Sequence, residues 1–390
     1  MAEKVVTLAR AYEIAVAELR ACYDVNGIVA GRGHYDDYWT RDAFFAWLGA
    51  LELGDFEVVE QHLRFLASLQ RGDGMIPFLV RRYVPWLSHL GVKIGLRAKP
   101  GFRVSKALWR SQVIDSNSYF VIGFAEFLKR AGDKEFLREY IPVLESALLW
   151  CLKRIKPGES LAWEGPLAGW NDSVIKSGKT LMTNVLFCRA FECWEEICGV
   201  YQIALRSEFS GVSAKIREAL QREFFNGTYF VDWIDRRGQR YNFFDSNANF
   251  LAVLWDVAAR SQGEGIIDFA LSQPFAGPLL KLVYPPYPQR CVAVSDRIWG
   301  IGDLACGEGM YWLEPTCLLA LCLIKMKRRD EARVILTGLA ELIALYDGAY
   351  EVYEWRRSEL HPVHRIYRAE HPYARGAALF VLACKRLGCA

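Results

Sequence analysis

The chain has 390 residues, of which 52% are hydrophobic and 24% are charged, a composition typical of a globular protein with a sizeable core. Its 48 basic and 45 acidic residues nearly balance, which excludes the overall basic field of a nucleic-acid-binding protein. Because the 11 cysteines form no C-x-x-C pair and no apolar run reaches membrane-spanning length, we expect neither a zinc motif nor a membrane protein.

The N-terminal segment MAEKVVTLARAYEIAVAELRA predicts an amphipathic helix. Its acidic residues distinguish it from the charged-then-apolar pattern of a signal sequence. The scattered cysteines are best interpreted as reduced thiols in a core. Together these features predict a cytoplasmic protein.

Six segments with one design follow along the chain, each a polar or small opening followed by a long apolar run. Their starts lie 57 to 75 residues apart, and the apolar residues surround the helix, as expected for helices buried on both sides. The segments are 40–53, 115–128, 183–194, 245–258, 314–326 and 371–387.

Amphipathic, charge-rich partners alternate with these segments, at 56–70, 134–155, 211–224, 265–273 and 329–346, with the N-terminal helix as the sixth. Six buried helices alternating with six half-exposed ones predict an all-α fold, an (α/α)6 barrel of six inner and six outer helices. A solenoid would need polar capping repeats at both ends, and none is visible in the sequence. We therefore expect one domain over 1–390.

Two interruptions stand out. The strand-like pieces 228–234 and 239–244 predict a small β-hairpin at one rim. The segment 75–109 carries many basic residues among aromatic ones. An interruption of this length is often a functional lid, and a solvated surface insertion is an equally good interpretation.

Polar residues cluster at and just before the starts of the six buried helices, where the loops of such a barrel meet in a funnel. Acids, amides and tryptophans recur there without a Ser-His-Asp arrangement. The residues are Tyr38 to Asp42, Asp115 to Asn117, Trp163, Glu164, Trp170 to Asp172, Asp245 to Asn249, Trp312, Glu314, Glu351 and Glu370.

Two carboxyl groups that flank a sugar bond are the minimal equipment for glycoside hydrolysis, and one of them must be protonated. Apolar neighbours disfavour a carboxylate, so Trp163 and Trp170 are expected to favour the protonated form of Asp172. Asp115 and Asp245 open helices and are interpreted as N-caps that at most line the site.

Other motifs carry little chemistry. His361 and His364 have suitable spacing for a metal, but a proline between them disrupts a helix and no third ligand is nearby. The stretch 300–303 reads as a turn because it lacks the setting of a nucleotide-binding loop. We expect no metal and no cofactor.

Three blocks resemble the (α/α)6 catalytic domain of inverting α-glycosidases, and the resemblance covers nearly the whole chain. They are YWTRDAFFAWLGALELGDFEVVEQHLRFLASLQRGDGMIPF, GWNDSVIKSGKTLMTNVLF and YDGAYEVYEWRRSELHPVHRIYRAEHPYARGAALFVLA. The chain looks most like the glucosidase half of glycogen-debranching enzymes. It is also similar to trehalases, processing α-glucosidase I and mannosylglycerate hydrolases.

The resemblance implies that Arg41 and Asp42 hold the sugar that is cleaved off. It implies that Asp172 is the general acid and that Glu351 is the general base, with Glu370 as a competing candidate for the base. The remaining candidate substrate-binding residues are Trp39, Asn117, Trp163, Trp170, Trp312 and Glu314, with Glu370 if it is not the base.

The expected activity is removal of a terminal α-linked glucosyl or mannosyl residue from an oligosaccharide or a small glycoside, with inversion. Debranching or trimming of oligosaccharides is included in this expectation. The alternatives are a sugar epimerase or an unsaturated uronide hydrolase on the same barrel, and a non-catalytic carbohydrate-binding barrel. The sequence does not specify the sugar, the linkage or the oligomeric state.

Overall fold

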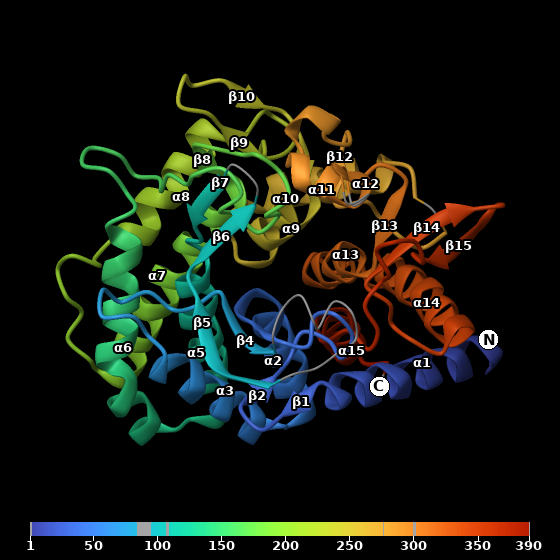
Figure 1. Cartoon of the computed structure of the whole chain (residues 1–390), viewed down its shortest axis with the longest axis horizontal. Helices are drawn as coiled ribbons and strands as arrows, with labels where there is room; N and C mark the ends of the chain where they lie inside the picture. The colour runs from blue at the N-terminus through green and yellow to red at the C-terminus, as the bar shows by residue number, and fades with distance from the viewer. Residues whose placement is uncertain (1, 84–94, 107–108, 276, 299–301, 390) are drawn as a thin grey trace.

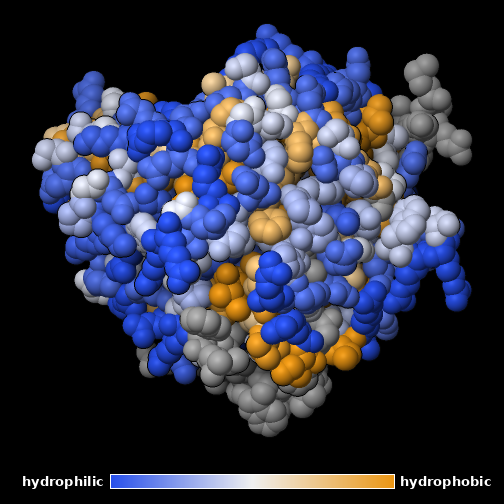
Figure 2. All heavy atoms as spheres, turned by 90° about the horizontal axis from the view of Figure 1, so that it is seen from above, coloured by the Kyte–Doolittle hydropathy of each residue, from blue (hydrophilic) through white to orange (hydrophobic). Residues whose placement is uncertain are grey.

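The computed structural model describes residues 2–83, 95–106, 109–275, 277–298 and 302–389. Helices dominate it, as predicted, and short strands accompany them (Figure 1). Within these ranges, the helices include none that is long and apolar enough to cross a membrane. The face shown in Figure 2 is mostly hydrophilic, with hydrophobic residues gathered in small areas.

The predicted apolar segments form helices that are buried nearly all round. They are α2 (Thr40–Leu53), α5 (Ser116–Ala131), α7 (Leu181–Tyr201), α9 (Ser246–Leu254), α13 (Leu313–Lys325) and α15 (Ala374–Leu387). In the described part of the chain each of these six contacts the next, and α15 contacts α2, so the contacts close into a ring. Figure 1 shows α2 and α15, from opposite ends of the chain, beside each other.

The amphipathic partners pack on the outside of this ring. They are α1 (Ala2–Ala21), α3 (Phe56–Ser68), α6 (Lys134–Leu152), α8 (Val212–Glu223), α10 (Arg260–Ser272) and α14 (Arg329–Tyr346). Helix α3 contacts α2 and α5, α6 contacts α5 and α7, and α8 contacts α7. Helix α10 contacts α9 and α13, while α14 and α1 both contact α15. Each of these outer helices therefore packs against one or two of the inner helices.

Helix α9 is shorter than the predicted segment 245–258. Asp245 caps its first turn, as predicted, by accepting a hydrogen bond from the Ala248 N–H at 3.0 Å. The helix ends at Leu254, and Asp256 adopts a left-handed backbone conformation with φ of 55°, which no α-helix accommodates. The apolar pattern therefore extended past the point where the backbone turns.

Short strands lead directly into four of the described inner helices. They are β3 (Tyr38–Trp39) before α2, β8 (Lys179–Thr180) before α7, β11 (Phe244–Asp245) before α9 and β13 (Met310–Trp312) before α13. Each pairs with a strand from a neighbouring loop, so hydrogen bonds fix the rim at which these helices begin.

The predicted hairpin is present as β9 (Trp233–Ile234) paired with β10 (Arg240–Tyr241), and β8 adds a third strand. In a separate sheet, β13 pairs with β14 (Val352–Arg356), which pairs with β15 (Glu359–Pro362). Strand β11 pairs with β12 (Val283–Tyr284), and β1 (Tyr23–Asp24) pairs with β2 (Gly27–Ile28).

The segment 75–109 also contains sheet structure where it is described. Strand β4 (Leu79–Tyr83) pairs with β3 and with β5 (Gly95–Gly101), while β6 (Arg103–Lys106) pairs with β7 (Trp109–Gln112). Residues 84–94 and 107–108 of the predicted lid lie outside the described residues. Because Leu79 lies opposite Trp39, the segment is held against the start of α2.

Candidate active site

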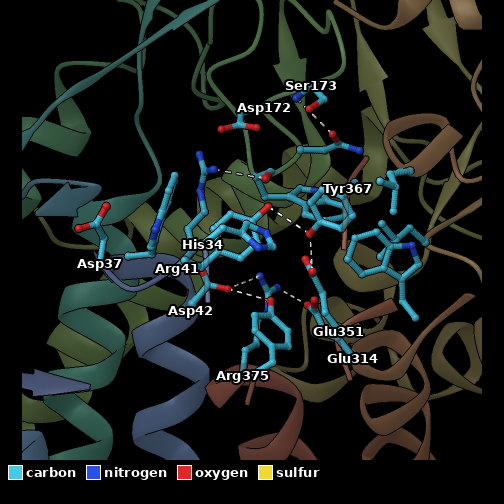
Figure 3. Close-up of a pocket in the computed structure, with 18 of the residues that line it drawn as sticks. His34, Asp37, Arg41, Asp42, Asp172, Ser173, Glu314, Glu351, Tyr367 and Arg375 are labelled. Carbon is cyan, nitrogen blue, oxygen red and sulfur yellow. Dashed lines mark hydrogen bonds and ion pairs between the residues drawn. The ribbon is translucent and has the colours of Figure 1, made fainter. Parts of the chain in front are cut away.

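A cavity of about 460 Å³ opens at the rim where the inner helices begin. Its volume lies in the range of small-molecule sites. Eight of the predicted site residues line it: Trp39, Arg41, Asp42, Trp170, Asp172, Trp312, Glu314 and Glu351. They come from four segments that are far apart in the sequence, and Figure 3 shows Arg41, Asp42, Asp172, Glu314 and Glu351 among the side chains that line the cavity.

Arg41, on the first turn of α2, ties the loop of Asp172 to the helix ring. Its Nε donates to Asp115 at 2.7 Å, and its Nη2 donates to the Gly169 carbonyl at 2.8 Å. Its Nη1 lies 3.3 Å from the Trp170 carbonyl. Burial lowers the pKa of Arg41, but the charges of Asp115 and Asp172 outweigh it and raise that pKa. Arg41 is therefore a permanent cation that fixes the backbone just before Asp172.

Asp115 does not cap α5, contrary to the sequence interpretation. Its backbone adopts a helical conformation and its side chain makes no capping bond. The carboxylate is fully buried and pairs with Arg41, whose side chain is only 6% exposed. Leaving the buried guanidinium of Arg41 without an anion would cost more free energy than leaving the helix without this cap.

Asp42 and Glu314 flank a second buried arginine, Arg375, on the first turn of α15. Arg375 forms an ion pair with Glu314, and its Nη1 lies 3.8 Å from Asp42. Asp42 also accepts a hydrogen bond from the Tyr373 hydroxyl at 2.9 Å. Burial raises the pKa of Glu314 to about 7, although the charge of Arg375 lowers it. This cluster forms a polar wall of the cavity (Figure 3).

Glu351 lies just before strand β14 and is buried at the cavity wall. The Tyr367 hydroxyl donates to its Oε2, and the backbone N–H of Glu370 donates to the same oxygen at 3.2 Å. Burial raises the pKa of Glu351 to about 7, while the hydrogen bond from Tyr367 and the charge of His34 lower it. A carboxyl group with this pKa can exchange a proton near neutral pH.

Asp172 lies on the opposite side of the group from Glu351 in Figure 3. The neighbouring Trp170 is oriented by a buried network, because its indole N–H donates to Asp245 at 2.6 Å. Lys176 lies 3.6 Å from Asp245 and bonds to Asp232 at 2.8 Å. The loop that carries Asp172 is therefore held on one side by Arg41 and on the other by this network.

Three predicted site residues lie outside the cavity lining. Asn117 is buried and its amide bonds to backbone groups of residues 74, 76 and 147, so it joins the loop after α3 to helix α6. Trp163 donates to Glu159 at 2.9 Å and packs under Lys156, away from Asp172. Trp163 therefore does not provide the apolar neighbour that the sequence interpretation assigned to it.

Glu370, the third of these, accepts hydrogen bonds from three consecutive backbone N–H groups, of Gly33, His34 and Tyr35, and from the His34 ring. These donors occupy both of its oxygens. It is consequently unsuited to activating a water molecule, and the competition between Glu351 and Glu370 for the base favours Glu351.

The cavity also contains residues that the sequence interpretation missed. They are His34, Tyr35, Asp37, Arg81, Ser173, Leu282, Asp296, Leu304, Tyr367, Tyr373 and Arg375. Arg375 begins an inner helix, so the same helix-start rule could have found it. The others lie on loops whose approach depends on tertiary structure.

Two tryptophans carry unused hydrogen-bond donors at this site. The indole nitrogens of Trp39 and Trp312 are buried and have no hydrogen-bond partner among the described residues. Both rings line the cavity, where flat faces can stack on a sugar and N–H groups can donate to hydroxyls. Within the same described ranges, no group of three or more His, Cys, Asp or Glu side chains is placed to hold a metal ion.

No protein-family model matches the chain, and no curated protein matches its sequence. Solved structures do match its fold. The GH63 mannosylglycerate hydrolase from Thermus thermophilus in complex with glucose has a TM-score of 0.69 and 15% identity, over 95% of this chain and 99% of that one. A glycosidase variant in complex with glucose has a TM-score of 0.67 and 13% identity, over 98% of both chains. The chain thus has a fold similar to that of these glycosidases over nearly its whole length.

Proposed function

We propose that the protein is an inverting glycoside hydrolase that removes a terminal α-linked glucosyl or mannosyl residue. The whole chain, 1–390, is then one catalytic domain with an (α/α)6 barrel. Oligosaccharides, including branched ones, and small glycosides are the proposed substrates. The segment 75–109 is the proposed lid.

The observation that carries this proposal is the placement of Asp172 and Glu351. They come from loops before α7 and α15, yet both face one cavity of sugar-binding size. An inverting glycosidase needs a pair of carboxyl groups on opposite sides of the scissile bond, with room for a water molecule. Their carboxyl groups are accordingly expected to lie about 6.5–9.5 Å apart.

In this mechanism Asp172 donates its proton to the leaving oxygen while Glu351 takes a proton from the attacking water. The pKa of Glu351, raised by burial to about 7, makes this group a base that is matched to neutral pH. Tyr367 orients it by donating to one oxygen, which leaves the other oxygen for water. Arg41 contributes by holding the loop of Asp172 in place.

Asp42, Trp39, Trp170, Trp312 and Glu314 form the proposed subsite of the cleaved sugar. Carboxylates and indole N–H groups can bind its hydroxyls, and the indole rings can stack on its apolar faces. Two of the structural neighbours were solved with glucose, and the mannosylglycerate hydrolase was also solved with Tris and D-glycerate. These ligands agree with a small sugar as the substrate of this cavity.

The first experiment is a hydrolysis screen over glycogen dextrins, trehalose, kojibiose, glucosylglycerate, mannosylglycerate and sucrose. The Asp172→Asn variant should lose most activity on the best of these substrates. It should retain much more on a glycosyl fluoride, because fluoride needs little protonation to leave. The Glu351→Gln variant should be slow on both kinds, because both require an activated water molecule. Full activity of both variants would exclude the proposed roles.

One observation keeps an epimerase as a second candidate. Epimerases on related barrels use histidine bases, and the structure places His34 at the cavity wall. His371, which opens the last predicted helical segment, instead contacts Glu18 and stacks on Tyr350. Conversion of a free sugar into its epimer, without hydrolysis of any glycoside, would favour this candidate.

A further inference from the structure

Glu370 forms a clamp around the loop that precedes α2. It is buried, and its carboxylate accepts the backbone N–H groups of Gly33 at 2.5 Å, His34 at 3.1 Å and Tyr35 at 3.4 Å. Its Oε2 also lies 2.8 Å from Nδ1 of His34. Because a carboxylate only accepts, the hydrogen of the His34 ring must be on Nδ1.

Glu370 also contacts Glu351, through its backbone N–H. The backbone N–H of Glu370 and the Tyr367 hydroxyl both bond to Oε2 of Glu351. The ring of His34 packs edge-on against Tyr367, with centroids 5.1 Å apart. Figure 3 shows His34 close to Tyr367, on the side of the cavity where Glu351 lies. His34 is therefore fixed between the clamp and the proposed base.

The His34 ring also borders the cavity. Its Nε2 is buried without a hydrogen-bond partner among the described residues, and the side chain, which is 25% exposed, lines the cavity. The groups that face it are the carboxylates of Glu370 and Glu351 and the rings of Tyr35 and Tyr367. Because these groups include two anions and no other cation, they favour the protonated, positively charged form of the His34 ring.

The charges of His34 and Glu351 each shift the pKa of the other group. Burial lowers the pKa of His34, but the hydrogen bond that its ring donates to Glu370 and the charges of Glu370 and Glu351 raise it above its ordinary value. The positive charge of His34 in turn lowers the pKa of Glu351, against the effect of burial. Burial keeps Tyr35 and Tyr367 protonated by raising their pKa values, so neither hydroxyl adds a charge.

We propose that His34, held by Glu370, is a positioning residue that supplies the positive charge beside Glu351 and so favours the ionised form of this base near neutral pH. This inference rests on the proposed role of Glu351. The Glu370–His34 pair would then have an electrostatic role in addition to fixing the backbone of residues 33–35.

The first test is the pH profile of kcat/KM for a glycosyl fluoride, a substrate that isolates the step in which Glu351 activates water. The His34→Asn variant keeps an N–H for Glu370 but loses the charge. Its acidic limb should move to higher pH by roughly one unit, while kcat on the alkaline plateau changes little. His371→Asn is the matched control, because His371 also pairs with a glutamate, Glu18, but does not line the cavity. Its limb should stay in place.

The second test needs no activity. Proton NMR should assign the His34 ring by its absence from the His34→Asn spectrum, and a titration should then give its pKa in the wild type and in Glu351→Gln. Loss of the Glu351 charge should lower that pKa, whereas Glu18→Gln should not change it. If His34→Asn fails to fold, single replacement of the other five histidines assigns the His34 ring by elimination, and the Glu351→Gln titration still decides the question.

The two tests separate the inference from the proposed function. A His34 that responds to Glu351 in a protein without hydrolase activity would support the charge pairing and reject the function. An active hydrolase in which neither the acidic limb nor the His34 titration responds would overturn the inference and leave the function standing.

Discussion

The buried pair of Arg41 and Asp115 is where the fold and the site are joined, and its loss should be costly. The side chains are 6% and 0% exposed, and Arg41 also holds the carbonyls of Gly169 and Trp170. Arg41→Met keeps most of the volume but leaves the Asp115 carboxylate buried without a partner. Breaking such a pair costs about 3–5 kcal/mol, so the free energy of unfolding should fall by about that amount.

Urea unfolding followed by tryptophan fluorescence measures this loss, with the Arg41→Met/Asp115→Leu double variant as the control. Replacing both partners by apolar groups removes the unpaired charge, so the double variant should be more stable than Arg41→Met alone. The loop of Asp172 should nevertheless stay loosened, and activity should not return with stability. A loss below about 1 kcal/mol in Arg41→Met, or additive losses in the double variant, would refute this reasoning.

Three further predictions follow from the structure. Asp42→Asn should reduce kcat/KM at least tenfold, because a charge-assisted hydrogen bond to a sugar hydroxyl contributes about 1.5–3 kcal/mol; unchanged kinetics would make Asp42 merely structural. Burial raises the pKa of Glu164 to about 7 from 4.5, so the folded state binds its proton more tightly and stability falls as pH rises between these values. The free energy of unfolding of Glu164→Gln minus that of the wild type should therefore be larger at pH 8 than at pH 5, by up to about 3 kcal/mol in urea unfolding. An equal difference at both pH values would contradict this. If 75–109 is a lid, limited proteolysis should cut it in the free protein and a bound sugar should protect it, whereas equal cleavage would favour a plain surface insertion.

The helical part of the fold was readable from the sequence because each inner helix is apolar on all sides over several turns. Segment 40–53 matches the bounds of α2, and the other five segments fall on inner helices. The ring closure also followed from the alternation of two helix types. Strands of two residues, such as β3 and β8, carry no periodicity, so the sequence could not reveal the paired rim.

The site was only partly readable, because its contacts join loops that are distant in the sequence. A helix-start rule found Arg41 and Glu314, and it would also have found Arg375. It treated Asp115 as a cap because a helix-opening aspartate usually is one, and only the tertiary structure brings Arg41 to it. In the sequence Glu370 competed with Glu351 for the role of base, and the backbone N–H groups that occupy Glu370 distinguish the two.

The prediction that Trp163 lies beside Asp172 was wrong for a related reason. It lies only nine residues before Asp172, but the loop between them turns, and Trp163 faces Glu159 and Lys156 on another surface. Proximity along a loop does not determine which side chains share an environment. Trp170 does line the cavity, and its orientation depends on Asp245, which comes from the start of α9.

The most direct test of the central claim is the anomeric configuration of the first product. Proton NMR during hydrolysis of an α-linked substrate, recorded before mutarotation, distinguishes the two anomers of the released sugar. A water molecule activated by Glu351 and attacking opposite the oxygen protonated by Asp172 must release the β-anomer. Release of the α-anomer would contradict the inverting mechanism and the assignment of Glu351 as a base acting on water.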